Sequence, residues 1–507
     1  MADAKTLAEL IVRGDYNAAA IRAPGQEALT FDGLRTLCAD TLGVLNSAGI
    51  GRGDRVVIVL PNGPEMASAF IAVACAATAA PLNPAYRAEE FAFYISDLNA
   101  KAVIVMTGDE TPAIGAANKL NIPIIPLTPE TDGPAGTFSL APASAPPSAN
   151  GGPAGADDIA LILHTSGTTS RPKIVPLSHS NVCASGRNIS AWLELKPEDS
   201  CLNVMPLFHI HGLIAAVLSS LYAGASVACS PGFNALRFFA WLDEIKPTWY
   251  TAVPTMHQAI LARAGRNKEI VARNPLRLIR SSSSSLPAPV MTELEEVFSA
   301  PVIESYGMTE AAHQMASNPL PPRERQPGCV GIAAGPEVAI MNIAGELLAP
   351  GATGEIVIRG DNVTAGYENN EKANAEGFTN GWFRTGDQGV MDEEGYVTLT
   401  GRLKEIINRG GEKISPREVD DVLMTHPAVA QAVVFAMPHD KLGEDVAAAI
   451  VLREGEEASD KDIRAFAAER LAAFKVPRKI VLLEEIPKGA TGKLQRIGLA
   501  EKLGLVK

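Results

Sequence analysis

The chain has 507 residues, of which 47% are hydrophobic and 20% charged, a balance typical of a globular protein with two or three domains. Its formal net charge of −13 argues against nucleic acid or an anionic membrane as the main partner. The first residues lack the pattern of a secretory signal, and no apolar run reaches the roughly 18 residues of a membrane span, so we expect a cytoplasmic protein.

Strand-like and helix-like segments alternate in the first hundred residues. The apolar runs 55–61 and 102–106 are typical of buried parallel strands, and 63–80 between them has the composition of a helix. This βαβ order predicts an α/β sheet covered on both faces. Residues 129–158 are rich in Pro, Ala, Gly and Ser, and we predict a long surface loop there.

Further strand-like runs follow, separated by short helices. They lie at 160–164, 226–230, 248–253, 276–281 and 301–305. From residue 354 the chain changes to short strands with turn glycines, at 354–360 and 395–402, which predict a small β subdomain.

The last hundred residues have the pattern of a compact α+β unit. We predict helices at 416–425 and 459–474, and strands at 430–436, 447–452 and 479–483. The predicted fold class is therefore α/β. A large N-terminal domain, residues 1–402, has parallel-type sheets and the small β subdomain, and a small α+β domain follows at 403–507.

The six cysteines show no CxxC spacing and mostly lie in apolar runs. We predict that they are buried core residues rather than disulfides or zinc ligands.

An apolar run at 159–163 leads into TSGTTSRPK, residues 165–173. A strand that ends in glycine and hydroxyls exposes N–H and O–H donors together, which suits phosphate oxygens, and Lys173 adds a positive charge. The glycine and lysine spacing of a Walker A loop does not occur in the chain. A polar surface loop is the alternative interpretation.

Two more stretches carry groups suited to a nucleotide. ESYGMTE (304–310) offers an aromatic ring, a hydroxyl and a carboxylate that could stack on a base, bind a phosphate and hold Mg²⁺. WFRTGDQG (382–389) places Asp387 in a turn, where its carboxylate could accept hydrogen bonds from ribose hydroxyls. Each stretch could equally be an ordinary turn with a capping threonine or a turn aspartate.

The motifs TSGTTSRPK, YGMTE, WFRTGD, GRLKEIINRGGEKISP and PKGATGKLQR occur in this order. With the chain from about residue 25 to 500, this order resembles the adenylate-forming superfamily of acyl-CoA synthetases, luciferases and nonribosomal adenylation domains. Such enzymes activate a carboxylate with ATP to an acyl-adenylate and release pyrophosphate, and a thiol, usually that of CoA, then displaces AMP. The resemblance implies ATP, Mg²⁺ and CoA as cofactors.

The resemblance also implies roles for individual residues. The pyrophosphate end of ATP would be held by Thr165, Ser166, Gly167, Thr168, Thr169 and Lys173. The adenine and ribose would be contacted by Tyr306 with Gly307, by the serine segment that contains Ser284, and by Asp387 and Arg402. Thr309 would contact the α-phosphate, and Glu310 would hold Mg²⁺. Lys493 would bridge the α-phosphate and the substrate carboxylate, where a positioned cation offsets the charge that develops around phosphorus.

A mobile second domain follows from the two chemical steps. Adenylation needs Lys493 at the phosphate, whereas thioester formation needs an open path for the thiol. One rigid arrangement hardly serves both, so we expect rotation at the hinge position Lys404. Gly410 and Gly411 would then approach the pantetheine arm of CoA.

Three segments implied to wall the acyl site carry hydroxyls and imidazoles: PLFHIHG, RSSSSSL and MTEAAHQ. Buried polar groups left unpaired cost about 1–3 kcal/mol each, so this wall predicts a polar acid. SYGMTEAAH, ASNPLP, PLFHIHG, TWYTAVPTMHQ and INRGGEKISP together resemble the oxalyl-CoA synthetases of plants and fungi more than coumarate or fatty-acid ligases. By that resemblance Ser283 and His313 would hold the second carboxylate of oxalate, with His209 as a gate.

Alternatives remain open from the sequence. His209 could only shield the adenylate, and the serines could contact adenine through their backbone. The acid could be another small diacid such as malonate, or an aromatic or fatty acid. The chain could instead load a carrier protein or sense a nucleotide without turnover.

Overall fold

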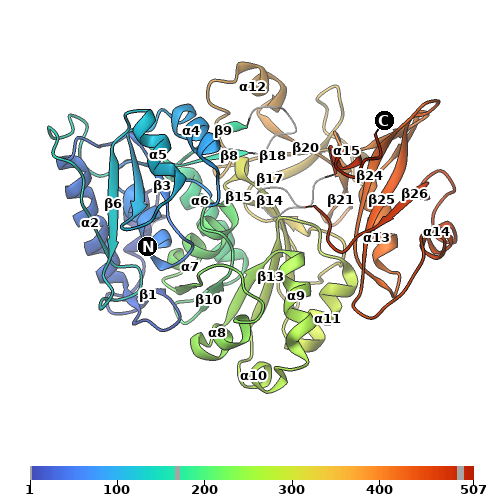
Figure 1. The fold of residues 1–507 in the computed structure, drawn as a ribbon, viewed down its shortest axis with the longest axis horizontal. Helices are drawn as coiled ribbons and strands as arrows, with labels where there is room; N and C mark the ends of the chain where they lie inside the picture. The colour runs from blue at the N-terminus through green and yellow to red at the C-terminus, as the bar shows by residue number, and fades with distance from the viewer. Residues whose placement is uncertain (1–2, 166–171, 488–495, 507) are drawn as a thin grey trace.

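A computed structural model of the chain describes residues 3–165, 172–487 and 496–506. The fold is mixed α/β with a separate C-terminal domain, as the sequence predicts (Figure 1). No helix among the described residues has both the length and the apolar character needed to cross a membrane. All six cysteines are buried, which confirms the prediction that they are core residues.

The first sheet has the strand order β7-β6-β5-β3-β4-β8-β9 and lies at the left of Figure 1. Its strands are β3 (Arg55–Val59), β4 (Thr78–Pro81), β5 (Ala102–Met106), β6 (Ile124–Pro129), β7 (Phe138–Leu140), β8 (Ile159–Thr165) and β9 (Lys173–Ser178). The inner strands run parallel, and β7 and β9 are antiparallel edges. Its helices are α2 (Phe31–Ser47), α3 (Pro64–Ala74), α4 (Ala88–Asp97) and α5 (Pro112–Lys119).

The helix predicted at 63–80 is wrong in its last part. Helix α3 ends at Ala74, and Thr78–Pro81 form the buried strand β4, which pairs with β3 on one side and β8 on the other. Alanine favours a helix locally, but two neighbouring strands impose the extended conformation here. The loop predicted at 129–158 contains β7, and backbone hydrogen bonds such as Arg52 N to Asn150 O hold it against the domain.

The second sheet has the order β16-β15-β14-β13-β12-β10-β11-β1-β2. Its strands are β1 (Ala19–Arg22), β2 (Leu29–Thr30), β10 (Ser200–Asn203), β11 (Ser226–Cys229), β12 (Trp249–Ala252), β13 (Leu278–Ser282), β14 (Val302–Met308), β15 (His313–Ser317) and β16 (Ile332–Ala333). The strands from β1 to β14 along this order are parallel, and β2, β15 and β16 are antiparallel additions.

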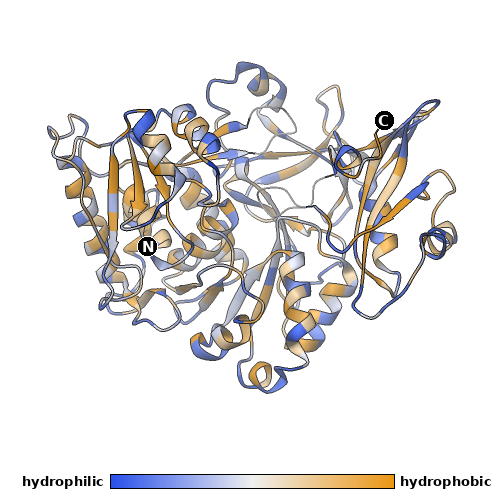
Figure 2. Cartoon of the chain, viewed as in Figure 1, coloured by the Kyte–Doolittle hydropathy of each residue, from blue (hydrophilic) through white to orange (hydrophobic). Residues whose placement is uncertain are grey.

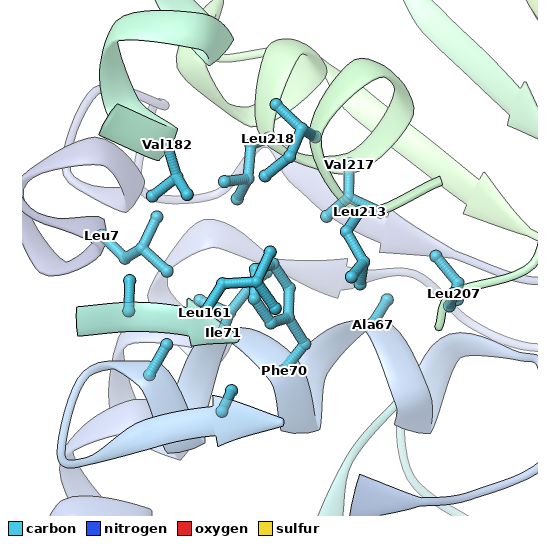
Figure 3. Close-up of a cluster of buried hydrophobic side chains, with 14 of the residues drawn as sticks. Leu7, Ala67, Phe70, Ile71, Leu161, Val182, Leu207, Leu213, Val217 and Leu218 are labelled. Carbon is cyan, nitrogen blue, oxygen red and sulfur yellow. The ribbon is translucent and has the colours of Figure 1, made fainter. Parts of the chain in front are cut away.

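Helices pack on this sheet and between the two sheets. They are α1 (Leu7–Ile11), α6 (His179–Trp192), the π-helix η1 (His211–Leu218), α7 (Ser219–Tyr222), α8 (Phe238–Ile245), α9 (Pro254–Ala264), α10 (Lys268–Arg273), α11 (Ala288–Phe298) and the short 3₁₀-helix η2 (Thr309–Ala311). Figure 3 shows the shared core, in which Phe70 of α3, Leu161 of β8, Val182 of α6 and Leu213 of η1 meet with no solvent exposure. This burial fixes the two sheets against each other.

An antiparallel subdomain follows, as the turn glycines predict. It comprises β17 (Glu337–Met341), β18 (Thr353–Arg359), α12 (Glu371–Gly377), β19 (Phe378–Thr379), β20 (Trp382–Met391) and β21 (Val397–Arg402).

The C-terminal domain has its own sheet, of order β23-β22-β25-β24 with β26 beside β25, and lies at the right of Figure 1. Its elements are β22 (Ile407–Arg409), β23 (Glu412–Ile414), α13 (Pro416–Met424), β24 (Val429–His439), β25 (Gly443–Leu452), α14 (Asp460–Ala468), β26 (Lys479–Leu482) and α15 (Leu499–Lys502). Figure 2 shows apolar residues along its long strands, which form a core separate from that of the large domain. The helix predicted at 459–474 is shorter than expected. The division between 402 and 403 stays a prediction.

Candidate active site

The candidate phosphate loop connects two paired strands. Thr165, the last residue of β8, lies opposite Lys173, the first residue of β9. The ladder therefore closes the base of the loop and brings two of the predicted phosphate ligands together. Ser166, Gly167, Thr168 and Thr169 lie outside the described residues.

A tyrosine links Lys173 to the predicted metal ligand. The Nζ of Lys173 lies 4.2 Å from the ring centroid of Tyr367, whose hydroxyl donates to Glu310 Oε1 at 2.8 Å. Burial raises the pKa of the Glu310 carboxyl and lowers the pKa of Lys173, so the charged form of each side chain is poorly solvated. Sequence reasoning missed Tyr367, which follows a glycine in a stretch without a recognisable motif.

The residues predicted for the nucleoside also converge. The hydroxyl of Tyr306, in β14, donates to Asp387 Oδ2 at 2.5 Å, and Arg402 Nε lies 3.1 Å from Asp387 Oδ1. Asp387 is in β20, directly opposite Arg402 of β21. Thr309 begins η2 just after β14, one residue before Glu310. Residues from three separated motifs thus meet at one place.

A second cluster forms where β12, β13 and β15 approach η1. His211 Nδ1 and Ser283 Oγ are 3.0 Å apart, and the rings of His211 and His313 have centroids 5.0 Å apart. His211 is 2% exposed and His313 1% exposed. On the other side of its ring, His211 Nε2 lies 2.6 Å from the hydroxyl of Thr251. The predicted pair Ser283 and His313 therefore belongs to one buried polar cluster.

Arg280 lies behind this cluster and was not given a role from the sequence. It is fully buried on β13, with Nη1 3.4 Å from His211 Nε2 and Nη2 3.5 Å from His313 Nδ1. Nη2 also donates to Gln314 Oε1 at 3.2 Å. The signal available in the sequence was a cation inside the apolar run LRLIRS, a position where a charged side chain needs an explanation.

The remaining predicted residues occupy distinct places. His209 lies two residues before η1, with its ring 4.7 Å from that of Phe208, and Ser284 is exposed after β13. Lys404 is exposed in the turn between β21 and β22, the connection between the two domains, and its charge contributes to lowering the pKa of Lys173. Gly410 and Gly411 form the turn between β22 and β23. Lys493 lies outside the described residues.

These observations define a two-domain α/β enzyme with charged and polar groups at the ends of parallel strands, where such folds bind ligands. The chain belongs to the AMP-binding enzyme family. The family model matches residues 11–368, and the model of the AMP-binding enzyme C-terminal domain matches 418–493.

Individual relatives cover nearly the same length. An oxalate–CoA ligase of Arabidopsis thaliana is 49% identical over 458 residues, which is 89% of each chain. ATP-bound MatB from Rhodopseudomonas palustris, 29% identical, has a TM-score of 0.88 with 98% of each chain covered. Apo MatB from the same organism, 28% identical, has a lower TM-score of 0.77 over 99% of this chain and 100% of its own.

Proposed function

We propose that this protein is an AMP-forming acid–CoA ligase whose acid is oxalate. It joins the acid to ATP as an acyl-adenylate with release of pyrophosphate, and CoA then displaces AMP to give the thioester. The name of the Arabidopsis relative supports this substrate, and so does one observation in the structure, the buried cluster of Ser283, His211 and His313.

The cluster favours a diacid because of its chemistry. Hydrocarbon acids need apolar walls, and a half-buried hydroxyl beside two buried imidazoles would lose hydrogen bonds against such an acid. Oxalate has two adjacent carboxylates, so one can attack ATP while the other accepts hydrogen bonds from Ser283 and His313. His209, next to η1, is the proposed gate.

For ATP we propose the residues that the nucleotide motifs supply. Thr165 and Lys173 contact the pyrophosphate end, together with the loop 166–169, and Thr309 contacts the α-phosphate. Asp387 and Arg402 bind the ribose, and Tyr306 lies beside the adenine, with the backbone of Gly307 and Ser284. Lys493 supplies the cation at the reacting phosphate.

Mg²⁺ fits Glu310. Its carboxylate is buried and poorly solvated, with Oε1 oriented by the hydroxyl of Tyr367. Mg²⁺ usually takes one or two protein carboxylates and completes its shell with phosphates and water. When bound, the ion would neutralise phosphate charge at this carboxylate.

The experiment that tests the proposal measures AMP release with ATP, Mg²⁺ and CoA, comparing oxalate, malonate, acetate, octanoate and coumarate. We expect a strong preference for oxalate, and a higher oxalate KM in Ser283→Ala and His313→Ala with little change in the ATP KM. A preference for a monoacid would contradict the substrate assignment while keeping the adenylation chemistry. AMP release that needs a carrier protein in place of free CoA would contradict the assignment of CoA as the thiol that accepts the acyl group.

A further inference from the structure

The guanidinium of Arg280 is a buried charge without a carboxylate partner among the residues that the structure describes. Its Nε also has no hydrogen-bond partner there. Three other arginines with limited exposure have carboxylate partners: Arg277 with Asp199, Arg384 with Glu355, and Arg496 with Asp420. A buried charge without a counter-ion is strongly unfavourable, so its presence calls for an anion that the protein itself does not supply.

Burial lowers the pKa of Arg280 to about 9, so the side chain is still positively charged at neutral pH. A guanidinium carries only N–H donors. The nitrogen atoms that it faces, His211 Nε2 and His313 Nδ1, must therefore be acceptors and carry no hydrogen. The hydroxyl of Thr251, 2.6 Å from the same His211 Nε2, then acts as a donor to this nitrogen.

The tautomers set the direction of the remaining hydrogen bonds. A neutral His211 without a hydrogen on Nε2 carries it on Nδ1 and donates to Ser283 Oγ. The hydroxyl hydrogen of Ser283 is then directed to another acceptor. In the same way, His313 carries its hydrogen on Nε2. Gln314 holds Nη2 of Arg280, the nitrogen that faces His313, because its amide donates to Ala334 O and so turns Oε1 toward the guanidinium.

We infer that Arg280 is a positioning residue that fixes the tautomers of His211 and His313, so that Ser283 and His313 present hydrogen-bond donors to the second carboxylate of a diacid. The same charge is buried away from solvent, where its attraction for an anion is only weakly screened. This inference rests on the proposed function, since it assumes that a carboxylate occupies the cluster. It explains how a charge with no solvent exposure can select a substrate that it does not touch.

The first test needs no substrate. Long-range ¹H–¹⁵N correlation spectra of the ¹⁵N-histidine-labelled wild-type protein report which ring nitrogen carries the hydrogen. We expect His211 protonated on Nδ1 alone and His313 on Nε2 alone. A hydrogen on His211 Nε2, or on both nitrogens of either ring, would overturn the inference whatever the substrate is.

The second test separates specificity from folding. Arg280→Met removes the charge at similar length, and Arg280→Lys keeps a charge without the planar fork. We expect Arg280→Met to raise the KM for oxalate by about 30-fold or more, with the KM for ATP and for glyoxylate, which lacks the second carboxylate, changed by less than about 3-fold. Arg280→Lys should recover part of the oxalate affinity. The matched control is Arg277→Met, at the residue directly before β13, which should leave the ratio of oxalate to glyoxylate KM unchanged.

The outcomes are distinguishable. Equal changes for oxalate and glyoxylate in Arg280→Met would make Arg280 a structural residue and leave the proposed function intact. A wild-type protein that does not use oxalate would contradict the proposed function, and the tautomer measurement would still decide the arrangement of the cluster. If Arg280→Met does not fold, the ratio of oxalate to glyoxylate KM in Arg280→Lys and the histidine spectra of the wild-type protein decide whether Arg280 is a positioning residue.

Discussion

Ser283 and His313, the residues that we assign to the second carboxylate, both have positive φ angles, +71° and +102°. Residues with a Cβ rarely adopt this conformation, because Cβ crowds the following carbonyl oxygen. Such strain persists where the surroundings hold it, and it is common at binding sites. Here the hydrogen bond with His211 holds Ser283, and pairing with Met308 across β14 and β15 holds His313.

Gly307 lets His313 approach β14. A Cβ at residue 307 would lie 2.0 Å from the carbonyl oxygen of His313 and 3.0 Å from its Nδ1. We predict that Gly307→Ala moves His313, lowers stability by about 1–3 kcal/mol and raises the KM for oxalate more than the KM for ATP. The control is Gly265→Ala at the end of α9, where a Cβ meets nothing within 4 Å. Thermal unfolding and steady-state kinetics check both, and equal behaviour of the two variants would contradict the role of Gly307.

Glu304 should make stability depend on pH. Its Oε1 accepts from Leu286 N at 3.0 Å, Oε2 has no partner among the described residues, and burial raises the pKa of the carboxyl from 4.5 to about 7. The folded state therefore holds the proton more tightly than the unfolded chain. This contribution to stability is complete below pH 4.5 and is lost as pH rises through 7.

Glu304→Gln removes that dependence. We predict that the free energy of unfolding of the variant, relative to that of wild type, is higher at pH 8 than at pH 5 by on the order of 1–3 kcal/mol. The measurement is the difference in Tm between variant and wild type at the two pH values. Glu454→Gln, at an exposed position, serves as the control, and its Tm should differ from that of wild type by the same amount at both pH values. A pH-independent difference for Glu304→Gln would contradict the prediction.

At the scale of elements, the local hydrophobic pattern predicts the buried strands well. It fails where pairing with neighbouring strands determines the conformation. The apolar runs that became β3, β5, β8 and β13 were predictable because each is buried on both faces. Strand β4 was not, since its alanines are extended only through pairing. The π-helix η1 was not predictable either, because its sequence HGLIAAVL contains nothing that distinguishes i+5 from i+4 hydrogen bonding.

The candidate site divides in the same way. The nucleotide residues were found because each lies within a short motif. The cluster around Arg280 was found only in part, because it draws single residues from β12, β13, β15 and η1. Only the order of the strands in the sheet brings those residues together, and no single stretch of the sequence predicts that order.

The hairpin of β22 and β23 offers a test of the second chemical step. Gly410 and Gly411 have φ angles of +60° and +103°, as a tight two-residue hairpin turn requires. We predict that Gly411→Ala slows thioester formation and leaves ATP–pyrophosphate exchange unchanged, because the strained turn no longer presents its backbone to the pantetheine arm. Gly395→Ala, in another turn with φ +87°, carries similar strain and should affect neither step. Slower exchange in Gly411→Ala would contradict the assignment.

At the scale of the whole molecule, the two domains have separate cores and meet through polar contacts. Those contacts include hydrogen bonds from Gln258 Nε2 to Ala430 O at 3.2 Å and from Arg417 Nη2 to Gly328 O at 3.5 Å. The higher similarity to ATP-bound than to apo MatB leads us to propose that this arrangement serves adenylation. Weak polar contacts across the interface suit a domain that must leave it after the first step.

If this arrangement serves adenylation, loosening it should impair one step selectively. Gln258→Ala and Arg417→Met each remove a cross-domain hydrogen bond worth about 0.5–1.5 kcal/mol, so we predict that ATP–pyrophosphate exchange slows by about 2- to 10-fold in each. Single-turnover thioester formation from the enzyme-bound adenylate should stay unchanged or become faster, because the domain leaves this orientation more easily. Arg453→Met, on the exposed surface of the same domain, is the control and should alter neither rate. A thioester step slowed as much as exchange would assign these contacts to general stability, and unchanged exchange would place adenylation in another arrangement of the two domains.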